Sequence, residues 1–533
     1  MKHIDDRLRA LKASGRTALA GTRGLGTIAI ERVAEQGDRT IVEEGERSLT
    51  RAELLDAACR LGGALLSRGL QPGASIAFQL PNWWEACVIN LAAALFRYRL
   101  VPLLTIYRKA ELSGMLQASG VEAIFVPERH RGFDFPALVR SIPGGPQHVF
   151  VVRGERGTDN CFDTLLRSPP SEAIPAEADD VKMILFTSGS TGRPKGVMHT
   201  HGALEALVRM AGEFWGVGED DTLYVPSPIG HVGGSIYAFE FPWITGCKAI
   251  LAESWDAAVA VEKIDSEGAT FMAGATPFLR QLVDAAAAAG SSLPGLRRYV
   301  CGGASVPPEL IRQGLERFTG AVVSRAYGST EIPLVCPGIR SRSEAEAHAD
   351  TDGEIQVDLR ILDDHGMPVA EGETGEIVAR GPQMLIGYLD PADDKDSFTA
   401  DGYFRMGDLG RRIDGRFLEI TGRKKDIIIR KGENISPLEI ENALSRHPAI
   451  RQTAVVGAPD AERGEIVVAF VVLAEDCTFT LADLRDHLDK MGLARQKFPE
   501  RLHLVSSLPM NSVGKVQKQE LKPLAVQVEL NSD

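Results

Sequence analysis

Residues 186–197 read Phe-Thr-Ser-Gly-Ser-Thr-Gly-Arg-Pro-Lys-Gly-Val, and this stretch decides how the whole chain is interpreted. It follows a short apolar segment, Met183 to Phe186, which is typical of a buried strand. Its glycines let the backbone turn tightly around an anion, and its hydroxyl groups donate short hydrogen bonds. Lys195 adds a compact positive charge, and successive backbone N–H groups in such a turn form an anion-binding nest. The stretch therefore predicts a phosphate-binding loop, with a flexible serine- and glycine-rich surface loop as the alternative.

This loop differs from two familiar nucleotide-binding patterns. The P-loop of NTPases needs Gly-Lys followed by Ser or Thr, whereas Gly196 follows Lys195 here. The stretch also lacks the Gly-x-Gly-x-x-Gly spacing of dinucleotide-binding proteins. Neither of these two classes is therefore indicated.

Strand and helix patterns alternate through the first part of the chain. Thr50 and Glu53 form a capping-box pattern at the start of an apolar-periodic helix that ends at Gly69. Buried strands are expected at residues 75–80, 101–104 and 121–126, with helical segments between them. Because strands that alternate with helices pair in parallel, the sequence predicts an α/β fold.

The pattern changes near residue 400, where glycine-marked turns follow one another closely. Beyond them, Ser436-Pro437-Leu438-Glu439 combines a helix N-cap, a proline at the first helical position and a capping-box glutamate. Strands are expected at residues 453–456 and 466–473, and a helix at about 481–491. We predict a large N-terminal α/β domain of several subdomains at residues 1–423 and a small α+β domain at residues 424–533.

Charge and cysteine usage exclude some classes of protein. The chain has 533 residues with 59 Lys and Arg against 72 Asp and Glu, a net charge of −13, which argues against a nucleic-acid-binding surface. The seven cysteines are scattered singly, which argues against a structural zinc site and suits a reducing compartment. The N-terminus lacks the apolar core of a signal peptide, and no stretch approaches about 18 uninterrupted apolar residues. We therefore expect a cytoplasmic protein without a membrane span.

Four further motifs follow the loop in order along the chain. They are Tyr327-Gly328-Ser329-Thr330-Glu331, Gly402-Tyr403-Phe404-Arg405-Met406-Gly407-Asp408, Gly422-Arg423-Lys424-Lys425-Asp426 and Gly514-Lys515. Together with the loop they resemble the adenylate-forming superfamily, which includes acyl-CoA synthetases, aryl-acid ligases, luciferases and peptide-synthetase adenylation domains. The resemblance implies the adenylate-forming fold, with a large α/β domain and a small mobile C-terminal domain.

The resemblance also implies the activity of an AMP-forming acyl-CoA synthetase. A carboxylate attacks the α-phosphorus of ATP to give an acyl-adenylate and pyrophosphate, and the thiol of CoA then displaces AMP to leave a thioester. ATP, Mg²⁺ and CoA are the expected cofactors and co-substrates, and the sequence is compatible with a homo-oligomer. A ligase that loads the pantetheine arm of a carrier protein is the first alternative, and an inactive nucleotide-binding regulator is the second.

Both reactants of the first step are anionic, so the site must neutralise charge and hold the reacting groups in line. By resemblance, Glu331 binds Mg²⁺, which prefers oxygen ligands, and Lys515 stabilises charge in the transition state. The residues that the resemblance makes catalytic are Lys515, Thr187, Glu331 and His231. Those expected to contact the nucleotide are Thr187, Ser188, Gly189, Ser190, Thr191, Gly192, Lys195, Gly303, Ala304, Ser305, Tyr327, Gly328, Thr330, Asp408, Arg423 and Lys515. By resemblance, Tyr327 lies against the adenine ring, residues 301–305 form the adenine-side loop, and Asp408, assisted by Arg423, binds the ribose. Within that loop we interpret Cys301 as a small core residue.

The segment after Pro228 resembles the lining of the acyl site in this superfamily. His231 would gate the pocket, and Gly233 and Gly234 are expected to leave room for a fairly bulky acyl group. The predicted pocket residues are His231, Val232, Gly233, Gly234 and Ser235. Apolar side chains in and after this segment favour a medium-chain, alicyclic or aromatic acid.

The two half-reactions need two arrangements of the domains. By resemblance the hinge maps to Lys425, which lies in a charged and exposed stretch between turns. The segment expected on the CoA side consists of Lys431, Gly432 and Glu433. The match around Lys515 is imperfect, because the positions before the Gly-Lys pair depart from the usual family residues. These positions hold Met510, Asn511 and Val513.

Overall fold

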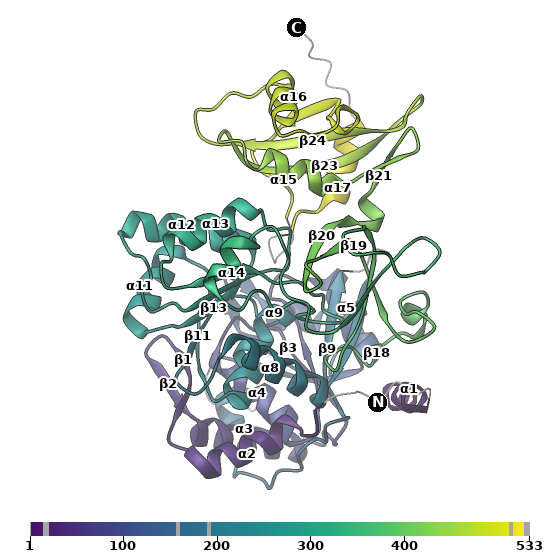
Figure 1. Ribbon diagram of the computed structural model, residues 1–533. Coiled ribbons are helices and arrows are strands. Elements are labelled where there is room, and N and C mark those ends of the chain that lie inside the picture. Colours follow the sequence, from purple (N-terminus) through teal and green to yellow (C-terminus); the bar gives the residue numbers. More distant parts are fainter. Residues whose placement is uncertain (1, 14–20, 156–159, 189–192, 511–514, 527–533) are drawn as a thin grey trace.

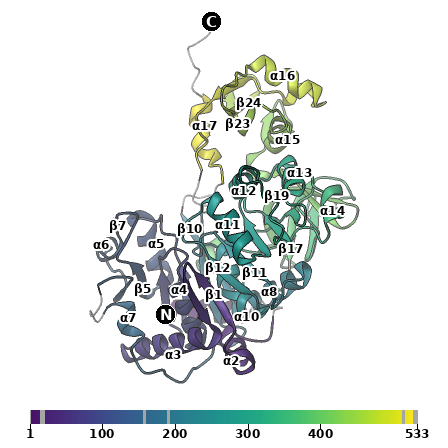
Figure 2. The ribbon, with the colours of Figure 1, turned by 90° about the vertical axis from the view of Figure 1, so that its left-hand side faces the viewer.

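Figure 1 shows the computed structural model, which describes residues 2–13, 21–155, 160–188, 193–510 and 515–526. In these residues the chain forms two seven-stranded sheets, a four-stranded sheet, a five-stranded sheet and a two-stranded ribbon. The first three sheets belong to the large N-terminal part, and the five-stranded sheet forms a C-terminal lobe at one end of the molecule (Figures 1 and 2). Sheets and helices alternate as the sequence predicts, so the α/β architecture is confirmed.

The first seven-stranded sheet is parallel except for one edge strand, which pairs antiparallel with its neighbour. Its strands, in order, are β15 (Val322–Arg325), β14 (Arg298–Cys301), β13 (Phe271–Gly274), β11 (Thr222–Val225), β12 (Lys248–Leu251), β1 (Thr40–Glu44) and β2 (Arg47–Thr50). Because β11, β13, β14 and β15 are parallel, the loops that follow them meet at one edge of the sheet. Three segments predicted to form the site lie in these loops.

The second seven-stranded sheet carries the predicted phosphate loop. Its strands, in order, are β18 (Gly387–Tyr388), β10 (Pro194–Thr200), β9 (Val181–Ser188), β4 (Arg99–Pro102), β3 (Ser75–Phe78), β5 (Val121–Pro127) and β8 (His148–Val152). β10 returns antiparallel to β9, and β18 pairs antiparallel with β10, whereas the other strands are parallel. The two arms of the loop, on β9 and β10, are therefore antiparallel neighbours in this sheet.

A third sheet, antiparallel throughout, carries the predicted ribose residues. Its strands, in order, are β16 (Asp358–Leu362), β17 (Gly375–Arg380), β19 (Phe404–Ile413) and β20 (Phe417–Arg423). Asp408 lies in the middle of β19, and Arg423 is the last residue of β20. The 3₁₀ turn η3 (Lys424–Asp426) begins at the next residue, where we predict the domain boundary.

One helix joins the two large sheets into a single core. All twelve residues of α4 (Trp84–Leu95) are buried. This helix packs on β1 of the first sheet and on β3 and β4 of the second. The remaining helices of the large part are α1 (Lys2–Ala13), α2 (Leu25–Gln36), α3 (Arg51–Ser67), α5 (Lys109–Ser119), α6 (Phe135–Arg140), α7 (Phe162–Leu165), α8 (His201–Trp215), α9 (Val232–Ser235), the π-helix η1 (Ile236–Glu240), α10 (Phe241–Ile244), α11 (Ala257–Glu267), α12 (Thr276–Ala289), α13 (Pro308–Arg317), α14 (Arg342–Ala347) and the 3₁₀ turn η2 (Pro391–Asp394). The ribbon consists of β6 (Arg129–His130) and β7 (Phe133–Asp134).

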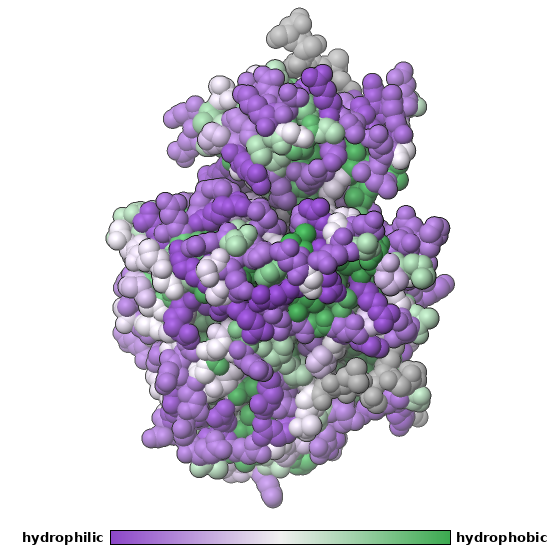
Figure 3. Space-filling model, viewed as in Figure 1, coloured by the Kyte–Doolittle hydropathy of each residue, from purple (hydrophilic) through white to green (hydrophobic). Residues whose placement is uncertain are grey.

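The C-terminal lobe is a small α+β unit, as predicted. Its strands are β22 (Glu433–Ile435), β21 (Ile428–Arg430), β24 (Gly464–Leu473), β23 (Ile450–Asp460) and β25 (Arg501–Leu504). Its helices are α15 (Pro437–Leu444), α16 (Leu481–Lys490), the 3₁₀ turn η4 (Arg495–Lys497) and α17 (Lys518–Val526). The space-filling view shows a narrowing between this lobe and the body, and the visible face is mostly hydrophilic (Figure 3).

Both predicted helix starts are confirmed, but only one of them has the predicted capping hydrogen bonds. The Thr50 and Glu53 side chains form the predicted capping box of α3. Ser436 is the N-cap of α15, but its hydroxyl makes no capping hydrogen bond. It donates instead to the backbone carbonyl of Thr421, at the end of the preceding sheet. Ser436 therefore ties the C-terminal lobe to the body, close to the predicted hinge.

No helix in the described parts of the chain combines the length and the apolar character that a membrane span requires. The described cysteines are all free, and the described residues contain no group of three or more His, Cys, Asp or Glu side chains that could hold a metal ion.

Candidate active site

Asp408, Arg423 and Tyr327 form the best-defined cluster among the predicted site residues. Asp408 and Arg423 face each other across the β19–β20 ladder, and Arg423 Nε lies 3.0 Å from Asp408 Oδ1. The Tyr327 hydroxyl donates to Asp408 Oδ2 over 2.7 Å. Asp408 is only 7% exposed. Its carboxylate has a partner on each oxygen and keeps further lone pairs for other donors. Sequence reasoning placed Tyr327 against adenine but missed its contact with Asp408.

Tyr327 is held as a proton donor by its surroundings. Burial, followed by the negative charge of Asp408, raises the pKa of Tyr327 well above its usual value. The phenol therefore stays protonated and donates to the carboxylate throughout the physiological range. The backbone of Tyr327 is itself fixed, because its N–H and carbonyl both bond to Cys336.

The predicted adenine-side loop, residues 302–305, follows β14 at the same edge of the first sheet. A side chain at Gly302 would meet the carbonyl oxygen of Ala326 at 2.8 Å, so glycine permits the close approach of the two loops there. Gly303 has a φ of +84° and open space around the place of its missing Cβ. Ala304 is partly exposed and Ser305 is exposed. The loop therefore offers an accessible, largely backbone surface beside Tyr327.

Cys301, directly before this loop, is a core residue. It is fully buried, and burial raises the pKa of its thiol to about 12. A thiol with such a pKa is not a nucleophile at neutral pH. The interpretation of Cys301 as a small core residue is confirmed.

The structure describes the two strands that flank the phosphate loop, β9 and β10. Thr187 on β9 is partly exposed and pairs with Lys195 on β10, and Ser188 pairs with Pro194. The predicted contacts of Gly189, Ser190, Thr191 and Gly192 lie outside the described residues.

An acidic turn holds both cations of the phosphate loop. Lys195 Nζ lies 3.6 Å from Asp393 Oδ1. Arg193 pairs with Asp393 at 2.9 Å and with Asp390 at 3.1 Å. Asp393 is 7% exposed, so it is a nearly buried counterion at the base of the loop. Sequence reasoning missed Arg193, Asp390 and Asp393, and three aspartates within residues 390–394 are the signal that was available.

Thr330 and Glu331 follow Tyr327 in a closely packed turn. A side chain at Gly328 would meet the backbone nitrogen of Leu334 at 2.5 Å, so this position requires glycine. The Thr330 carbonyl lies 2.7 Å from His199 Nε2. Burial lowers the pKa of His199 to about 4, so the ring is neutral and Nε2 carries the proton that it donates to this carbonyl. His199 therefore fixes the backbone beside the predicted metal ligand.

Glu331 lies against a tyrosine that the sequence did not single out. The Tyr388 hydroxyl donates to Glu331 Oε1 over 2.8 Å. Burial, followed by the charge of Glu331, raises the pKa of Tyr388 far above its usual value, so the phenol remains a donor. Among the described residues, no other group donates to the Glu331 carboxylate, so Oε2 keeps its full capacity for a ligand.

This carboxylate fits a magnesium ion that arrives with ATP. Mg²⁺ in nucleotide sites is usually bound by one or two carboxylates together with phosphate oxygens and water. A single partly exposed glutamate next to the phosphate loop meets this requirement. No described cluster would form a cage made of protein ligands alone.

The structure brings Lys515 of the C-terminal lobe to the residues of the large domain. Burial lowers the pKa of Lys515 to about 8; the positive charges of Arg423 and Lys425 add to this, and Asp408 opposes it. The charge of Lys515 also acts on His231. Burial, followed by the positive charge of Lys515, lowers the pKa of His231 to about 4. Lys515 of the C-terminal lobe therefore lies within electrostatic range of His231, Asp408 and Arg423 of the large domain. Met510 before Lys515 is described, whereas Asn511 and Val513 are not.

His231 has a defined tautomer. It is the N-cap of α9, and its Nδ1 accepts the backbone N–H of Gly233 over 3.1 Å. Because Nδ1 accepts and the ring is neutral, the proton is on Nε2. His231 thus presents an N–H donor on its other side.

The space expected beside Gly234 does not exist. A Cβ at this position would lie 2.3 Å from the carbonyl oxygen of Pro228, so Gly234 is required by close backbone packing. Val232, Gly234 and Ser235 are buried, whereas His231 and Gly233 are partly exposed. At Gly233 an added Cβ would meet only His231 within 4 Å. Of the two glycines, only Gly233 leaves room.

An aromatic cluster lies behind this helical segment. Tyr237, in the π-helix after α9, stacks on Trp215 with ring centroids 6.2 Å apart. Phe271 at the start of β13 packs on Trp215 at 4.8 Å and on Tyr237 at 5.7 Å. The predicted acyl segment is therefore backed by large apolar rings, in keeping with an apolar acid.

The predicted hinge and CoA residues are exposed. Lys425 lies in η3, and its neighbour Lys424 pairs with Glu376 of the body at 2.9 Å. Lys431, Gly432 and Glu433 form the turn between β21 and β22, where Lys431 and Gly432 have φ values of +51° and +81°. No hydrogen bond or ion pair within the described residues joins this turn to Asp408 or Arg423. In the arrangement observed, the structure does not bring the predicted CoA segment to the nucleotide residues.

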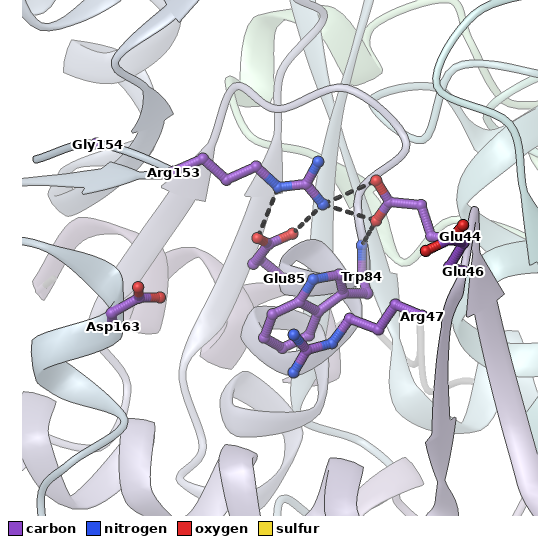
Figure 4. A pocket seen from close by; sticks show the side chains of 8 residues that line it. All are labelled: Glu44, Glu46, Arg47, Trp84, Glu85, Arg153, Gly154 and Asp163. Carbon is purple, nitrogen blue, oxygen red and sulfur yellow. Dashed lines mark hydrogen bonds and ion pairs between the residues drawn. The ribbon is translucent and has the colours of Figure 1, made fainter. Parts of the chain in front are cut away.

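A separate surface hollow of about 560 Å³ lies between β2, α4 and the residues after β8 (Figure 4). Arg153 bridges Glu85 at 2.8 Å and Glu44 at 2.7 Å, and Arg47 lies over the Trp84 ring at 3.9 Å. None of the predicted site residues lines it. Its central cluster sets two carboxylates, Glu44 and Glu85, against the single guanidinium of Arg153, so it offers no surplus of positive charge to a phosphate.

Comparison with known proteins agrees with this geometry. The model of the AMP-binding enzyme family matches residues 30–389, and that of the AMP-binding enzyme C-terminal domain matches residues 439–515. A medium-chain fatty-acid–CoA ligase of Escherichia coli K12 is 32% identical over 488 residues, which cover 90% of this chain and 86% of the relative. A salicylyl-CoA synthase / salicylate adenylyltransferase of a Streptomyces species is 31% identical, covering 94% of this chain and 93% of the relative.

A solved structure shows the same architecture. ATP-bound MatB from Rhodopseudomonas palustris superposes with a TM-score of 0.83 at 27% identity, covering 94% of this chain and 98% of MatB. The adenylate-forming fold implied by the motifs is thereby confirmed, including the large N-terminal and the smaller C-terminal domain. The two family models match in order and together span most of the sequence, so the chain belongs to the AMP-binding enzyme family.

Proposed function

We propose that this chain is an AMP-forming carboxylate–CoA ligase. A carboxylate and ATP give an acyl-adenylate and pyrophosphate, and CoA then gives the acyl-CoA and AMP. The names of its relatives bear out this class of activity. The observation that carries the proposal is the approach of Lys515, from the small domain, to Asp408, Arg423 and His231 of the large domain.

In the first half-reaction the chain's own residues hold anions together. Asp408 accepts the ribose hydroxyls, with Arg423 and Tyr327 fixing its carboxylate. Thr187 and Lys195 meet the phosphates, and Lys515 stabilises the charge that builds up as the carboxylate attacks phosphorus. Glu331 would hold Mg²⁺, which when bound neutralises phosphate charge. His231, neutral and with its proton on Nε2, donates toward the carboxylate of the acid.

The acid itself is proposed to be aromatic or medium-chain. The relatives named above act on salicylate and on medium-chain fatty acids. The aromatic cluster behind α9 supplies an apolar wall of the corresponding kind.

The second half-reaction is proposed to need a rotation of the small domain at Lys425. In the arrangement observed, Lys515 lies at the site, and the turn of Lys431, Gly432 and Glu433 is exposed. Rotation would withdraw the lysine and turn this segment toward the site for CoA. A cytoplasmic location and a homo-oligomer remain predictions.

Carboxylate-dependent ATP–pyrophosphate exchange tests the first half-reaction. We expect exchange with medium-chain or aromatic acids and none without acid. The absence of exchange across a broad panel of acids would favour the alternative of an inactive nucleotide-binding regulator.

The acceptor is tested separately. The labelled acyl-adenylate is offered CoA or a carrier protein that bears pantetheine, and thioester formation is followed. We expect CoA to be the faster acceptor. Preference for the carrier protein would identify a carrier-loading ligase instead.

A further inference from the structure

Residues 385–394, the strap, connect three parts of the site that are far apart in sequence. The N–H of Leu385 donates to the carbonyl of Glu331 over 2.7 Å. Tyr388 pairs with Val197 in the β10–β18 ladder, which places the strap beside the returning arm of the phosphate loop. Its far end carries Asp393, the counterion of Lys195. One segment therefore sets the spacing between the predicted metal ligand and the phosphate-binding cation.

Tyr388 occupies the centre of this strap and is held on several sides. It is 3% exposed. Its N–H donates to Asp394 Oδ1 over 2.9 Å, and its carbonyl accepts from Arg7 Nε over 3.2 Å. With the backbone fixed in this way, its hydroxyl reaches Glu331 Oε1 at 2.8 Å, and Lys195 Nζ lies 5.1 Å from the centre of its ring.

We propose that Tyr388 is a positioning residue for the divalent cation that accompanies ATP. Its hydroxyl holds Glu331 through Oε1 and leaves Oε2 to bind the ion. This inference rests on the proposed function, in which Glu331 is the metal ligand. Tyr388 lies outside the five motifs found in the sequence, and the three-dimensional contact with Glu331 assigns it this role.

The physical reason is preorganisation. Mg²⁺ demands near-ideal octahedral geometry, and a glutamate side chain has several rotamers of similar energy. A partner that fixes one carboxylate oxygen removes the entropy loss of ordering the side chain when the ion binds. Groups that hold a metal ligand in this way change metal affinity or activity by about 10- to 100-fold when they are mutated.

The ring of Tyr388 has a second neighbour, which makes a conservative test available. Lys195 lies over the ring face. Tyr388→Phe keeps this face and the apolar packing but removes the hydrogen bond to Glu331. Its effect is therefore confined to the carboxylate, provided that the strap stays folded.

The chain also offers a matched control. Tyr403 is 1% exposed, and its hydroxyl donates to a carboxylate as well, that of Asp358 on the outer strand of the third sheet. Two arginines lie over its ring, Arg360 at 4.1 Å and Arg380 at 4.5 Å. Tyr403→Phe thus removes a hydrogen bond of the same kind at a position with no described contact to Glu331 or Lys195.

The experiment measures metal binding directly. Mn²⁺ is titrated into the full-length protein with saturating ATP, and free Mn²⁺ is followed by electron paramagnetic resonance. Tyr388→Phe is expected to weaken the apparent Kd for Mn²⁺ about 10-fold, while Tyr403→Phe leaves it unchanged. ATP binding in the presence of a chelator should stay within about twofold of wild type for both variants, because Tyr388 acts through Glu331.

A double-mutant cycle completes the test. In a Glu331→Gln background, Tyr388→Phe should add no further loss of Mn²⁺ affinity, because the tyrosine has no ligand left to position. An unchanged Kd for Mn²⁺ in Tyr388→Phe, or equal loss of metal-free ATP binding, would overturn the proposal. If wild type shows no acid-dependent exchange but Tyr388→Phe still weakens Mn²⁺ binding, the proposed function fails and the inference stands.

Discussion

The pH dependence of the adenylation step should report Lys515. The pKa of this lysine is lowered to about 8, chiefly by burial and then by Arg423. A group with this pKa is ~90% protonated at pH 7 and ~10% protonated at pH 9. Only the ammonium form stabilises the negative charge of the transition state. Above pH 8, kcat/KM for ATP in the adenylation half-reaction should therefore fall about tenfold per pH unit, since kcat/KM reports the free enzyme.

The same reasoning predicts how kcat and the second half-reaction depend on pH. Bound ATP is anionic and raises the pKa of a nearby ammonium, so the limb in kcat should lie at higher pH than the limb in kcat/KM. Formation of thioester from supplied acyl-adenylate should rise above pH 8, because the CoA thiolate is the nucleophile.

Two variants provide the test by stopped-flow release of pyrophosphate. Lys515→Ala should lower the adenylation rate by about 10²–10³-fold and largely spare thioester formation from supplied acyl-adenylate. Lys515→Arg remains charged across this range, so its remaining adenylation activity should lose the descending limb. A limb of unchanged position in Lys515→Arg would refute the assignment of this pKa to Lys515. Equal loss of both half-reactions in Lys515→Ala would refute its role in adenylation.

Three other perturbations have expected outcomes. Asp408→Asn removes the charge that pairs with Arg423, so calorimetry should show ATP binding about 10- to 100-fold more weakly, whereas Asp358→Asn on the same sheet should have no effect. Equal ATP affinity of the Asp408→Asn variant and wild type would contradict the ribose assignment. Asp393→Asn leaves Arg193 and Lys195 without their nearly buried counterion, so KM for ATP should rise. The rise should be smaller in Asp390→Asn, which alters an exposed ion pair, and the reverse order would contradict the role of Asp393. Gly234→Ala forces a side chain against the backbone of Pro228 and should lower the free energy of unfolding by about 1–3 kcal/mol. Gly114→Ala in α5, where the space is open, should instead raise it by about 0.5–1 kcal/mol. A Gly234→Ala variant as stable as wild type would show that the backbone around Pro228 moves to accept the side chain.

Patterns local in sequence predicted the architecture well. The capping box at Thr50 and the apolar runs that became β3, β4 and β5 need only neighbours along the chain, and they were placed to within a few residues. Asp408 and Arg423, which come from two different motifs, also lie side by side, because β19 and β20 form a hairpin that places the two residues opposite each other.

Contacts between distant segments were beyond the reach of such patterns. Tyr388 lies 57 residues from Glu331 along the chain, on a strand of two residues, and no periodicity marks so short an element. Ser436 has the sequence of an N-cap, but its hydroxyl donates to the distant carbonyl of Thr421 and accepts no backbone N–H of the helix. Gly234 shows the same limit, because a glycine in sequence does not reveal whether another backbone fills the space of its missing side chain.

The junction between the third sheet and η3 places the ribose contact next to the pivot. Arg423 ends β20 and Lys424 begins η3, so only one residue separates the partner of Asp408 from the predicted hinge at Lys425. A point on an axis moves least when the parts around it turn. The AMP moiety would therefore stay anchored to the body while everything beyond residue 424 changes its orientation. A reactive acyl-adenylate would then remain bound between its formation and its use, with no step at which it must be released and recaptured.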